Sequence, residues 1–470
     1  MRRLIVYSAL YAGTAAFQKL LGFGIFLWLA RMLSVEQYAR FGLLYALQQG
    51  FATLASAGVV EAVVGQLRTY QSSDARSKLF GTATLTFLIL IFVAGVLGIL
   101  VWYVIPTRNP SELLPYVSVI VSGSVLALTS FQSQLARLDA GHLWSVLLNT
   151  VPVLSALLGG FAAFVLTPSL TAFFGGTALC VLVVSCGLWI FHRRLLSIDG
   201  ARSMLRPLLL QAAPYSIVAL LGWLSGYGNN YIIKLVLPDS AVARYTFALS
   251  LCSVMLLVSG ALNQVWSPRF YDLARRQPFE LIERQNQSFY RMLALALGFA
   301  GGLVTLVFPA AMRTLGGNLV SYQDATVPLA LLLSGYVILT PWWHCQNYLM
   351  FHGMGRSILK ITLITSTIGI SLLLLMMWVL GPIGIYIGFA LQMILRSVAI
   401  TLEARKFWPV RIGVSGVTAG LSLIVMGCVL SSVTSSRVLP ELVYVVVFVL
   451  LAGVFFYRDF VTLTAKQAIQ

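Results

Sequence analysis

YAGTAAFQKLLGFGIFLWLA, residues 11–30, is an almost wholly apolar run that carries one charged residue, Lys19. A helix of about 20 such residues is about 30 Å long, which matches the hydrocarbon core of a bilayer. In a span that starts near residue 7, Lys19 lies about 18 Å along the helix, so it cannot easily reach the interface. The stretch therefore predicts a membrane span with a charge that faces protein or a water-filled path.

Similar apolar runs recur along the whole chain. Hydrophobic residues make up 59% of the sequence and charged residues 10%, against roughly 25% charged in soluble domains. The runs lack the polar and apolar alternation of barrel strands, so they predict helices with internally satisfied backbones. We expect an all-α integral membrane protein of about fourteen transmembrane helices, at 7–31, 37–64, 79–104, 113–138, 143–166, 169–191, 207–235, 241–267, 289–309, 325–350, 358–380, 383–404, 412–433 and 440–457.

The basic residues indicate how these spans are oriented. With the N-terminus on the cytoplasmic side, most of the 31 Lys and Arg residues fall in segments on that side, as the positive-inside rule requires. An even number of spans then places both termini in the cytoplasm. The net charge of +17 is explained by topology and by contact with anionic lipid headgroups, so we expect membrane lipids and no nucleic acid as partners.

An internal repeat divides the chain. The segment ALYAGTAAFQKLLGFGIFLWLARMLSVEQYARFGLLYAL (9–47) aligns without a gap with APYSIVALLGWLSGYGNNYIIKLVLPDSAVARYTFALSL (213–251), including Gly22 with Gly226 and Arg40 with Arg244. The alignment predicts two parallel six-helix lobes, a plan found in transporters. We expect lobes at 1–200 and 201–407, followed by appended helices 13 and 14 at 408–470.

Two stretches resemble a known family. LSVEQYARFGLLYALQQGFATLASAGV (33–59) is similar to the first loop and second helix of bacterial polysaccharide flippases of the MOP exporter superfamily, the Wzx-like group of O-antigen and exopolysaccharide translocases. VARYTFALSLCSVMLLVSGALNQVWSPRFYDLARR (242–276) resembles the eighth helix of that family and its exit. The family pattern in the first stretch is supplied by Leu33, Glu36, Tyr38, Arg40, Phe41 and Gly42, with Ser34 where glycine is commoner.

The resemblance implies a fold and an activity. The fold is a V-shaped pair of lobes around a central cavity. The implied activity is alternating-access transfer of a polyprenyl-diphosphate-linked oligosaccharide from the inner to the outer leaflet of the bacterial cytoplasmic membrane, for O-antigen, capsule or exopolysaccharide synthesis. Polysaccharide polymerase and export machinery would then be partners.

Five cations are candidates for binding the diphosphate of such a carrier, because a dianion in a low-dielectric path needs positive charge. Each also has a structural interpretation, which is pairing inside the bundle for the first and anchoring to headgroups for the others. The candidates are Lys19, Arg40, Lys234, Arg244 and Arg269.

Polar side chains within the spans suit sugar hydroxyls, although interhelical hydrogen bonds explain each of them singly. They are Gln18, Gln48, Gln132, Asn229, Asn230 and Asn263, together with Trp342, which could stack on a sugar ring or anchor at an interface. Glu61 is the most deeply embedded acidic residue, and it is either an ion-coupling carboxylate or half of a salt bridge at a helix end.

Other functional classes have less support. The sequence contains no G-x-x-x-x-G-K-[ST] loop and no H-E-x-x-H motif, so we expect no catalytic residues, no cofactor, no metal site and no enzymatic activity. A membrane polymerase or ligase would need a longer outer linker than any present. An ion-coupled multidrug or small-molecule exporter of the same superfamily remains the alternative, although the first span contains no acidic residue.

Overall fold

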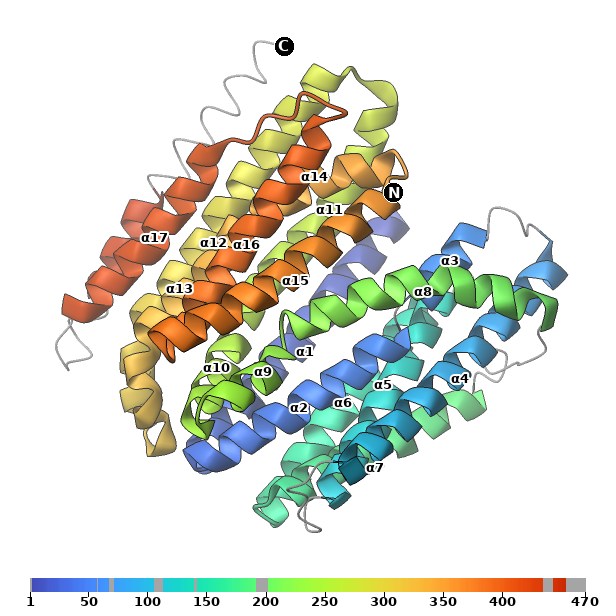
Figure 1. The fold of residues 1–470 in the computed structure, drawn as a ribbon, viewed down its shortest axis with the longest axis horizontal. Helices are drawn as coiled ribbons and strands as arrows, with labels where there is room; N and C mark the ends of the chain where they lie inside the picture. Colours follow the sequence, from blue (N-terminus) through green and yellow to red (C-terminus); the bar gives the residue numbers. More distant parts are fainter. Residues whose placement is uncertain are drawn as a thin grey trace. The chain divides into compact units, whose positions relative to one another are not determined.

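The computed structural model describes residues 2–56, 58–66, 72–104, 113–138, 142–191, 202–433 and 443–453. Within these ranges every regular element is a helix (Figure 1). Twelve helical segments there are long and apolar enough to cross a membrane, and the helix at Val443–Gly453 is apolar but shorter. The expected all-α membrane class is therefore confirmed, with a number of spans close to the expected one.

The chain forms two compact units. The first comprises Met1–Ile25 and Gln37–Tyr231, and the second comprises Phe26–Glu36 and Ile232–Gln470. The chain crosses between the units three times, within α1 (Arg2–Met32), near the start of α2 (Val35–Ser56) and within α9 (Asn229–Val236). The other helices of the first unit are α2 (Val35–Ser56), α3 (Val59–Gln66), α4 (Ser73–Val104), α5 (Leu113–Leu138), α6 (His142–Leu166), α7 (Leu170–Phe191) and α8 (Arg202–Leu224).

The second unit contains the remaining helices. They are α10 (Asp239–Leu251), α11 (Ser253–Arg276), α12 (Phe279–Leu315), η3 (Gly317–Ala325), α13 (Thr326–Ile338), α14 (Thr340–Phe351), α15 (Gly355–Leu380), α16 (Ile383–Arg405) and α17 (Val414–Val433). At 37 residues α12 is the longest of these, about 55 Å by helix geometry. Its first turns therefore extend beyond the predicted span at 289–309.

The predicted second span, 37–64, is divided into α2 and α3. Gly58 lies between them at φ +84°, a left-handed conformation that L side chains rarely adopt. A Cβ at this position would lie 2.2 Å from the carbonyl oxygen of Ala212 in α8. The chain can turn and still touch α8 here because the residue is glycine.

Three other predicted spans are also interrupted rather than continuous. The span at 207–235 consists of α8 and α9 separated by a turn at 225–228, the span at 241–267 changes direction at Cys252, and the span at 325–350 does so at Leu339. Glycines at 226 and 228 and the proline at 341 supply local reasons for two of these breaks. Broken helices are common where transporters bind their ligands.

Glycine pairs allow α12 and α17 to pack with their backbones close together, and Figure 1 shows the two helices side by side. A Cβ on Gly298 would lie 2.4 Å from the Cα of Gly420, and one on Gly427 would lie 2.2 Å from the carbonyl oxygen of Gly302. Buried Leu295, Leu306, Leu423 and Phe448 complete this contact. The contact attaches the region after α16 to the rest of the second unit.

The core of the first unit is also apolar. Phe87 of α4 and Phe131 of α5 are fully buried and stack with their ring centroids 4.5 Å apart. They belong to a cluster that includes residues of α3 and α8, such as Val63 and Leu208. Packing of this kind holds α3, α4, α5 and α8 together around the Gly58 turn.

Candidate functional site

The break between α8 and α9 lies against α2. The indole nitrogen of Trp223 donates to the carbonyl oxygen of Ala46 at 2.8 Å, and the hydroxyl of Tyr231 donates to that of Leu43 at 2.8 Å. The amide of Asn230 reaches the carbonyl oxygen of Gly42 at 3.4 Å. Polar side chains on both sides of the turn at 225–228 thus bind the backbone of one helix, which holds the turn in place.

Both asparagines of α9 are buried, each 1% exposed. The amide of Asn229 donates to the carbonyl oxygen of Ser225 at 3.3 Å. Nearby, the rings of Tyr45 and Tyr227 meet edge to face at 5.6 Å. This part of the first unit is a polar and aromatic layer built on α2, α8 and α9, and it contains two of the residues predicted to bind sugar.

The other predicted polar residues of the first unit bridge helices. Gln18 of α1 donates to the carbonyl oxygen of Asn149 at 3.1 Å, and Gln48 of α2 donates to the hydroxyl of Ser122 at 2.6 Å. Gln132 of α5 is fully buried and accepts a hydrogen bond from the indole of Trp189 at 2.6 Å. These contacts are the interhelical hydrogen bonds that were the alternative to sugar binding, and they do not require a sugar.

The predicted cations are all exposed within their own units: Lys19, Arg40, Lys234, Arg244 and Arg269. Lys234 forms an ion pair with Asp239, at the start of the next helix. Arg244 lines a cavity of about 210 Å³ together with Asp324 and Tyr386. Among the described residues, none forms an ion pair or hydrogen bond with the ammonium group of Lys19.

Three predicted positions remain. Glu61 belongs to α3, but its side chain is outside the described part of the structure. Trp342 of α14 is half-buried. Asn263 of α11 accepts a hydrogen bond from the hydroxyl of Tyr290 at 2.9 Å and donates to the carbonyl oxygen of Ser259 at 2.9 Å. It is the one predicted sugar candidate of the second unit that joins a larger polar network.

The centre of that network is a group that we call the Glu283 cluster: Glu283 and Gln287 of α12, His344 and Tyr348 of α14, and the backbone of Arg411. The carboxylate of Glu283 lies 3.3 Å from the Nε2 atom of His344, and both residues are buried. It also accepts hydrogen bonds from the hydroxyl of Tyr348, the backbone N–H of Arg411 at 2.7 Å and the amide of Gln287 at 3.0 Å.

A second layer of hydrogen bonds connects the cluster to α11. The indole of Trp266 donates to Asn286 at 2.9 Å, and Asn286 donates to the carbonyl oxygen of His344 at 3.4 Å. The amide of Asn347 donates to the hydroxyl of Tyr290 at 2.9 Å, which continues the network to Asn263. Helices α11, α12 and α14 are thus joined by polar side chains throughout their contact.

Sequence reasoning did not single out the Glu283 cluster, because it assigned residues 268–288 to a linker. A signal was present in the spacing. Positions 283, 286, 287 and 290 lie on one face of a helix, and each carries a side chain that can hydrogen-bond. Positions 344, 347 and 348 repeat the spacing of 283, 286 and 287. Two matching sets of polar positions predict a contact between the helices that carry them.

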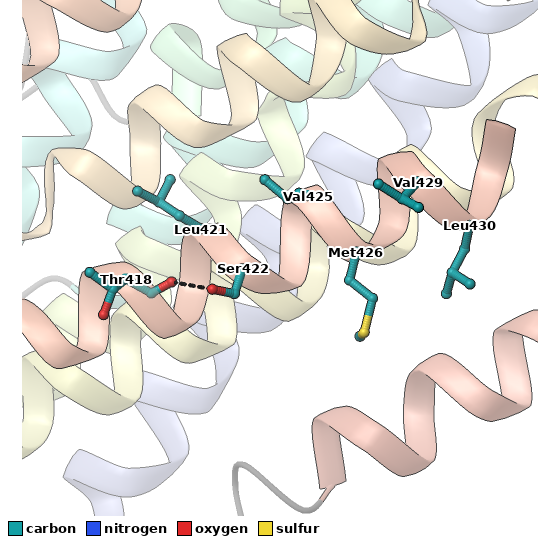
Figure 2. Close-up of a pocket in the computed structure, with 7 residues that line it drawn as sticks. All are labelled: Thr418, Leu421, Ser422, Val425, Met426, Val429 and Leu430. Carbon is teal, nitrogen blue, oxygen red and sulfur yellow. Dashed lines mark hydrogen bonds between the residues drawn. The ribbon is translucent and has the colours of Figure 1, made fainter.

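An apolar groove lies on α17. It has a volume of about 560 Å³ and is lined by Leu421, Val425, Met426, Val429 and Leu430, with Thr418 and Ser422 at one end (Figure 2). The hydroxyl of Ser422 donates to the backbone oxygen of Thr418 at 2.9 Å, so this polar end is internally bonded. Such a groove suits hydrocarbon chains. Within the described residues no group of His, Cys, Asp and Glu has the arrangement of a metal site.

The described helices define a polytopic helical membrane protein. Its fold is similar to that of the lipid II flippase MurJ in an inward closed conformation, with a TM-score of 0.72 and 12% identity over 96% of this chain and 99% of the other. It is also similar to an inward-facing multidrug resistance MATE family transporter of the MOP superfamily, with a TM-score of 0.65 and 15% identity over 85% of this chain and 94% of that one.

A third similar structure is a MOP superfamily transporter from Pyrococcus furiosus, with a TM-score of 0.51 and 12% identity over 86% of this chain and 94% of the other. The model of the family described as "Polysaccharide biosynthesis protein" matches residues 8–274. The chain belongs to this family, and its fold is that of MOP superfamily flippases and transporters. A comparison with curated protein sequences gives no significant match.

Proposed function

We propose that this protein transfers a polyprenyl-diphosphate-linked oligosaccharide from the inner to the outer leaflet of the bacterial cytoplasmic membrane. The glycan would serve O-antigen, capsule or exopolysaccharide synthesis. The observation that carries the proposal is the family match over residues 8–274, in a chain whose fold is similar to that of a lipid II flippase. The similar flippase handles a lipid-linked sugar, which is the same chemical class of substrate.

Transfer of such a substrate moves a dianionic group through a region of low dielectric constant, so it needs fixed positive charge along the path. Lys19 is proposed to contact the diphosphate in mid-membrane, because its ammonium group has no carboxylate partner among the described residues. Arg40 and Arg244 would accept the anion near the outer side, with Lys234 and Arg269 as further contacts.

Alternating access supplies the movement in this proposal. The lobes at 1–200 and 201–407 would rock about the substrate path, and the helices after residue 408 would border it with the apolar groove of α17. Both termini would lie in the cytoplasm. Energy would come from an ion gradient or the membrane potential, and Glu61 stays a predicted coupling carboxylate.

The similarity to a MATE family transporter supports a second candidate, an ion-coupled exporter of small molecules. Exporters of organic cations need acidic groups in the transport path, because a cation in the membrane must be paired. The described part of α1 contains Lys19 and no Asp or Glu. This charge pattern favours an anionic substrate.

The proposal is tested in cells depleted of this protein, by mass spectrometry of their polyprenyl-linked sugars. Accumulation of a diphosphate-linked oligosaccharide repeat, with loss of the surface polysaccharide, would support the proposal and identify the glycan. Unchanged glycolipids and normal surface polysaccharide would instead favour the small-molecule exporter.

A further inference from the structure

The Glu283 cluster places two titratable side chains in direct contact inside the second unit. Glu283 is 5% exposed and His344 is 3% exposed, and the carboxylate and Nε2 atoms are 3.3 Å apart. An isolated charge buried in this way costs several kcal/mol, so such groups are kept only where they are paired and hydrogen-bonded. None of the proposed substrate contacts uses either residue.

The hydrogen bonds around the pair determine which group exchanges a proton. Tyr348, Gln287 and the Arg411 N–H all donate to Glu283, which stabilises the ionised carboxylate even when His344 is neutral. When His344 is protonated, the pair is an ion pair of zero net charge. An imidazole can both accept and donate a proton, so His344 is the group of this pair suited to bind and release one.

A small cavity borders His344. Its volume is about 20 Å³, and its lining includes Gln287, Tyr290, Arg291, Thr340 and His344 itself. A cavity holds one water molecule when it exceeds about 10–15 Å³ and offers two to four polar partners, and this one meets both conditions. A water molecule there would give the imidazole a route for its proton that does not pass through the apolar core.

The pair lies where three segments of the second unit meet. Glu283 is in α12, and His344 is in α14, five residues after the break at Leu339 that separates α14 from α13. Arg411 belongs to the connection between α16 and α17, and the amide of Gln287 donates to the carbonyl oxygen of Arg411. Deprotonation of His344 would remove the electrostatic attraction between α12 and α14, close to the break at Leu339.

We propose that the Glu283–His344 pair is a proton-binding site that couples a proton gradient to the movement of the second unit. The inference rests on the proposed function in one respect, because the step coupled to the proton is transfer of the lipid-linked sugar. Other ionisable groups around the pair are Tyr348 and Cys345 of α14, Tyr290 and Arg291 of α12, and Arg411 in the connection. Arg405 of α16 influences Cys345 electrostatically.

Proton binding is measured first, independently of any substrate. The chain contains only four histidines, so ¹⁵N-histidine NMR of the purified full-length protein can be assigned with His344→Gln. We expect the His344 signals to change from the protonated to the neutral form as pH is raised. Glu283→Gln should shift that transition to lower pH, because the protonated imidazole loses its carboxylate partner. His344 signals that stay in one form throughout would overturn the proposal.

Coupling is measured next, in vesicles that contain the protein and a fluorescent polyprenyl-diphosphate chitobiose as the probe. We expect an imposed pH difference to accelerate transfer of the probe by the wild-type protein, and this acceleration to be lost in Glu283→Gln and His344→Gln. The exposed residues Glu280 and His352 provide matched controls as Glu280→Gln and His352→Gln, which should behave like wild type.

The two proposals fail in different ways. The proton site would be contradicted if transfer by the wild-type protein did not respond to the pH difference, or if Glu283→Gln and His344→Gln kept the response. Neither result would count against the proposed flippase function. No transfer of the probe under any condition would count against the proposed function, while the NMR titration would still decide whether His344 binds a proton.

Discussion

At the scale of the residue, Lys19 is the position on which the proposed substrate chemistry depends most. It is exposed in the first unit, in the middle of a helix that is otherwise apolar. A central Lys costs about 2.5–3.5 kcal/mol to insert in a membrane helix, so its presence needs a compensating role. Binding a diphosphate is a role that requires positive charge and not the lysine side chain as such.

We therefore expect Lys19→Ala to abolish polysaccharide export while the level of the protein in the membrane stays near normal. Lys19→Arg should keep most of the export, because it keeps the charge. Export is measured by the surface polysaccharide of a deletion strain that carries each variant, with immunoblots for membrane level. Lys406→Ala is a control, since Lys406 is exposed and pairs with Glu403 three residues before it. Normal export by Lys19→Ala would exclude Lys19 from the substrate path.

Sequence reasoning at this scale singled out polar residues within apolar spans but not their partners. Gln18, Gln48 and Gln132 were recognisable as polar groups in apolar spans, and the structure pairs each with a neighbouring helix. Nothing in the sequence distinguishes such a pair from a group that faces a cavity, because the distinction depends on helix rotation. Glu283 was missed for a different reason, since the length of α12 moves it from a linker into a buried contact.

At the scale of the element, the Gly58 turn determines how α2 passes into α3. Gly58→Ala would place a methyl group against Ala212 and add about 1–2 kcal/mol of strain from the left-handed backbone. We expect a lower Tm for the purified protein. Gly353→Ala is the matched control, because Gly353 has φ +70° with nothing within 4 Å of an added Cβ. Equal Tm losses in the two variants would mean that the contact with α8 adds nothing.

The contact between α12 and α17 is a second prediction at this scale. Gly420→Leu would force the two backbones apart, and overpacking of this kind typically costs about 1–3 kcal/mol. Thermal unfolding in detergent should show the loss, whereas Gly187→Leu in α7 should have little effect, because an added Cβ there meets nothing within 4 Å. A Gly420→Leu protein as stable as wild type would contradict the close approach of these helices.

Hydropathy predicted the positions of most elements well, because the length of an apolar run is fixed by the bilayer. It could not predict the breaks at 225–228, Cys252 and Leu339. An interrupted helix remains apolar on both sides of its break, so the run looks continuous. Gly226, Gly228 and Pro341 were visible signals, but glycine and proline are also tolerated inside unbroken membrane helices. In α1, the repeat-related glycines 22 and 24 lie within a continuous helix.

At the scale of the whole molecule, the distribution of Lys and Arg predicts that both termini lie in the cytoplasm. A fluorescent protein fused to the C-terminus should therefore fold and fluoresce, and alkaline phosphatase at the same place should stay inactive. The reverse pattern would require an odd number of spans and a different assignment of inner and outer charges.

The central claim is that this protein moves a lipid-linked oligosaccharide across the bilayer. The most direct test reconstitutes the purified protein in vesicles with the glycolipid that accumulates in depleted cells, and measures how much becomes accessible from the opposite leaflet. We expect rapid transfer with the wild-type protein and only slow, spontaneous transfer with Lys19→Ala or without protein. If transfer is equally slow in all three vesicles, the protein is not the flippase for that lipid.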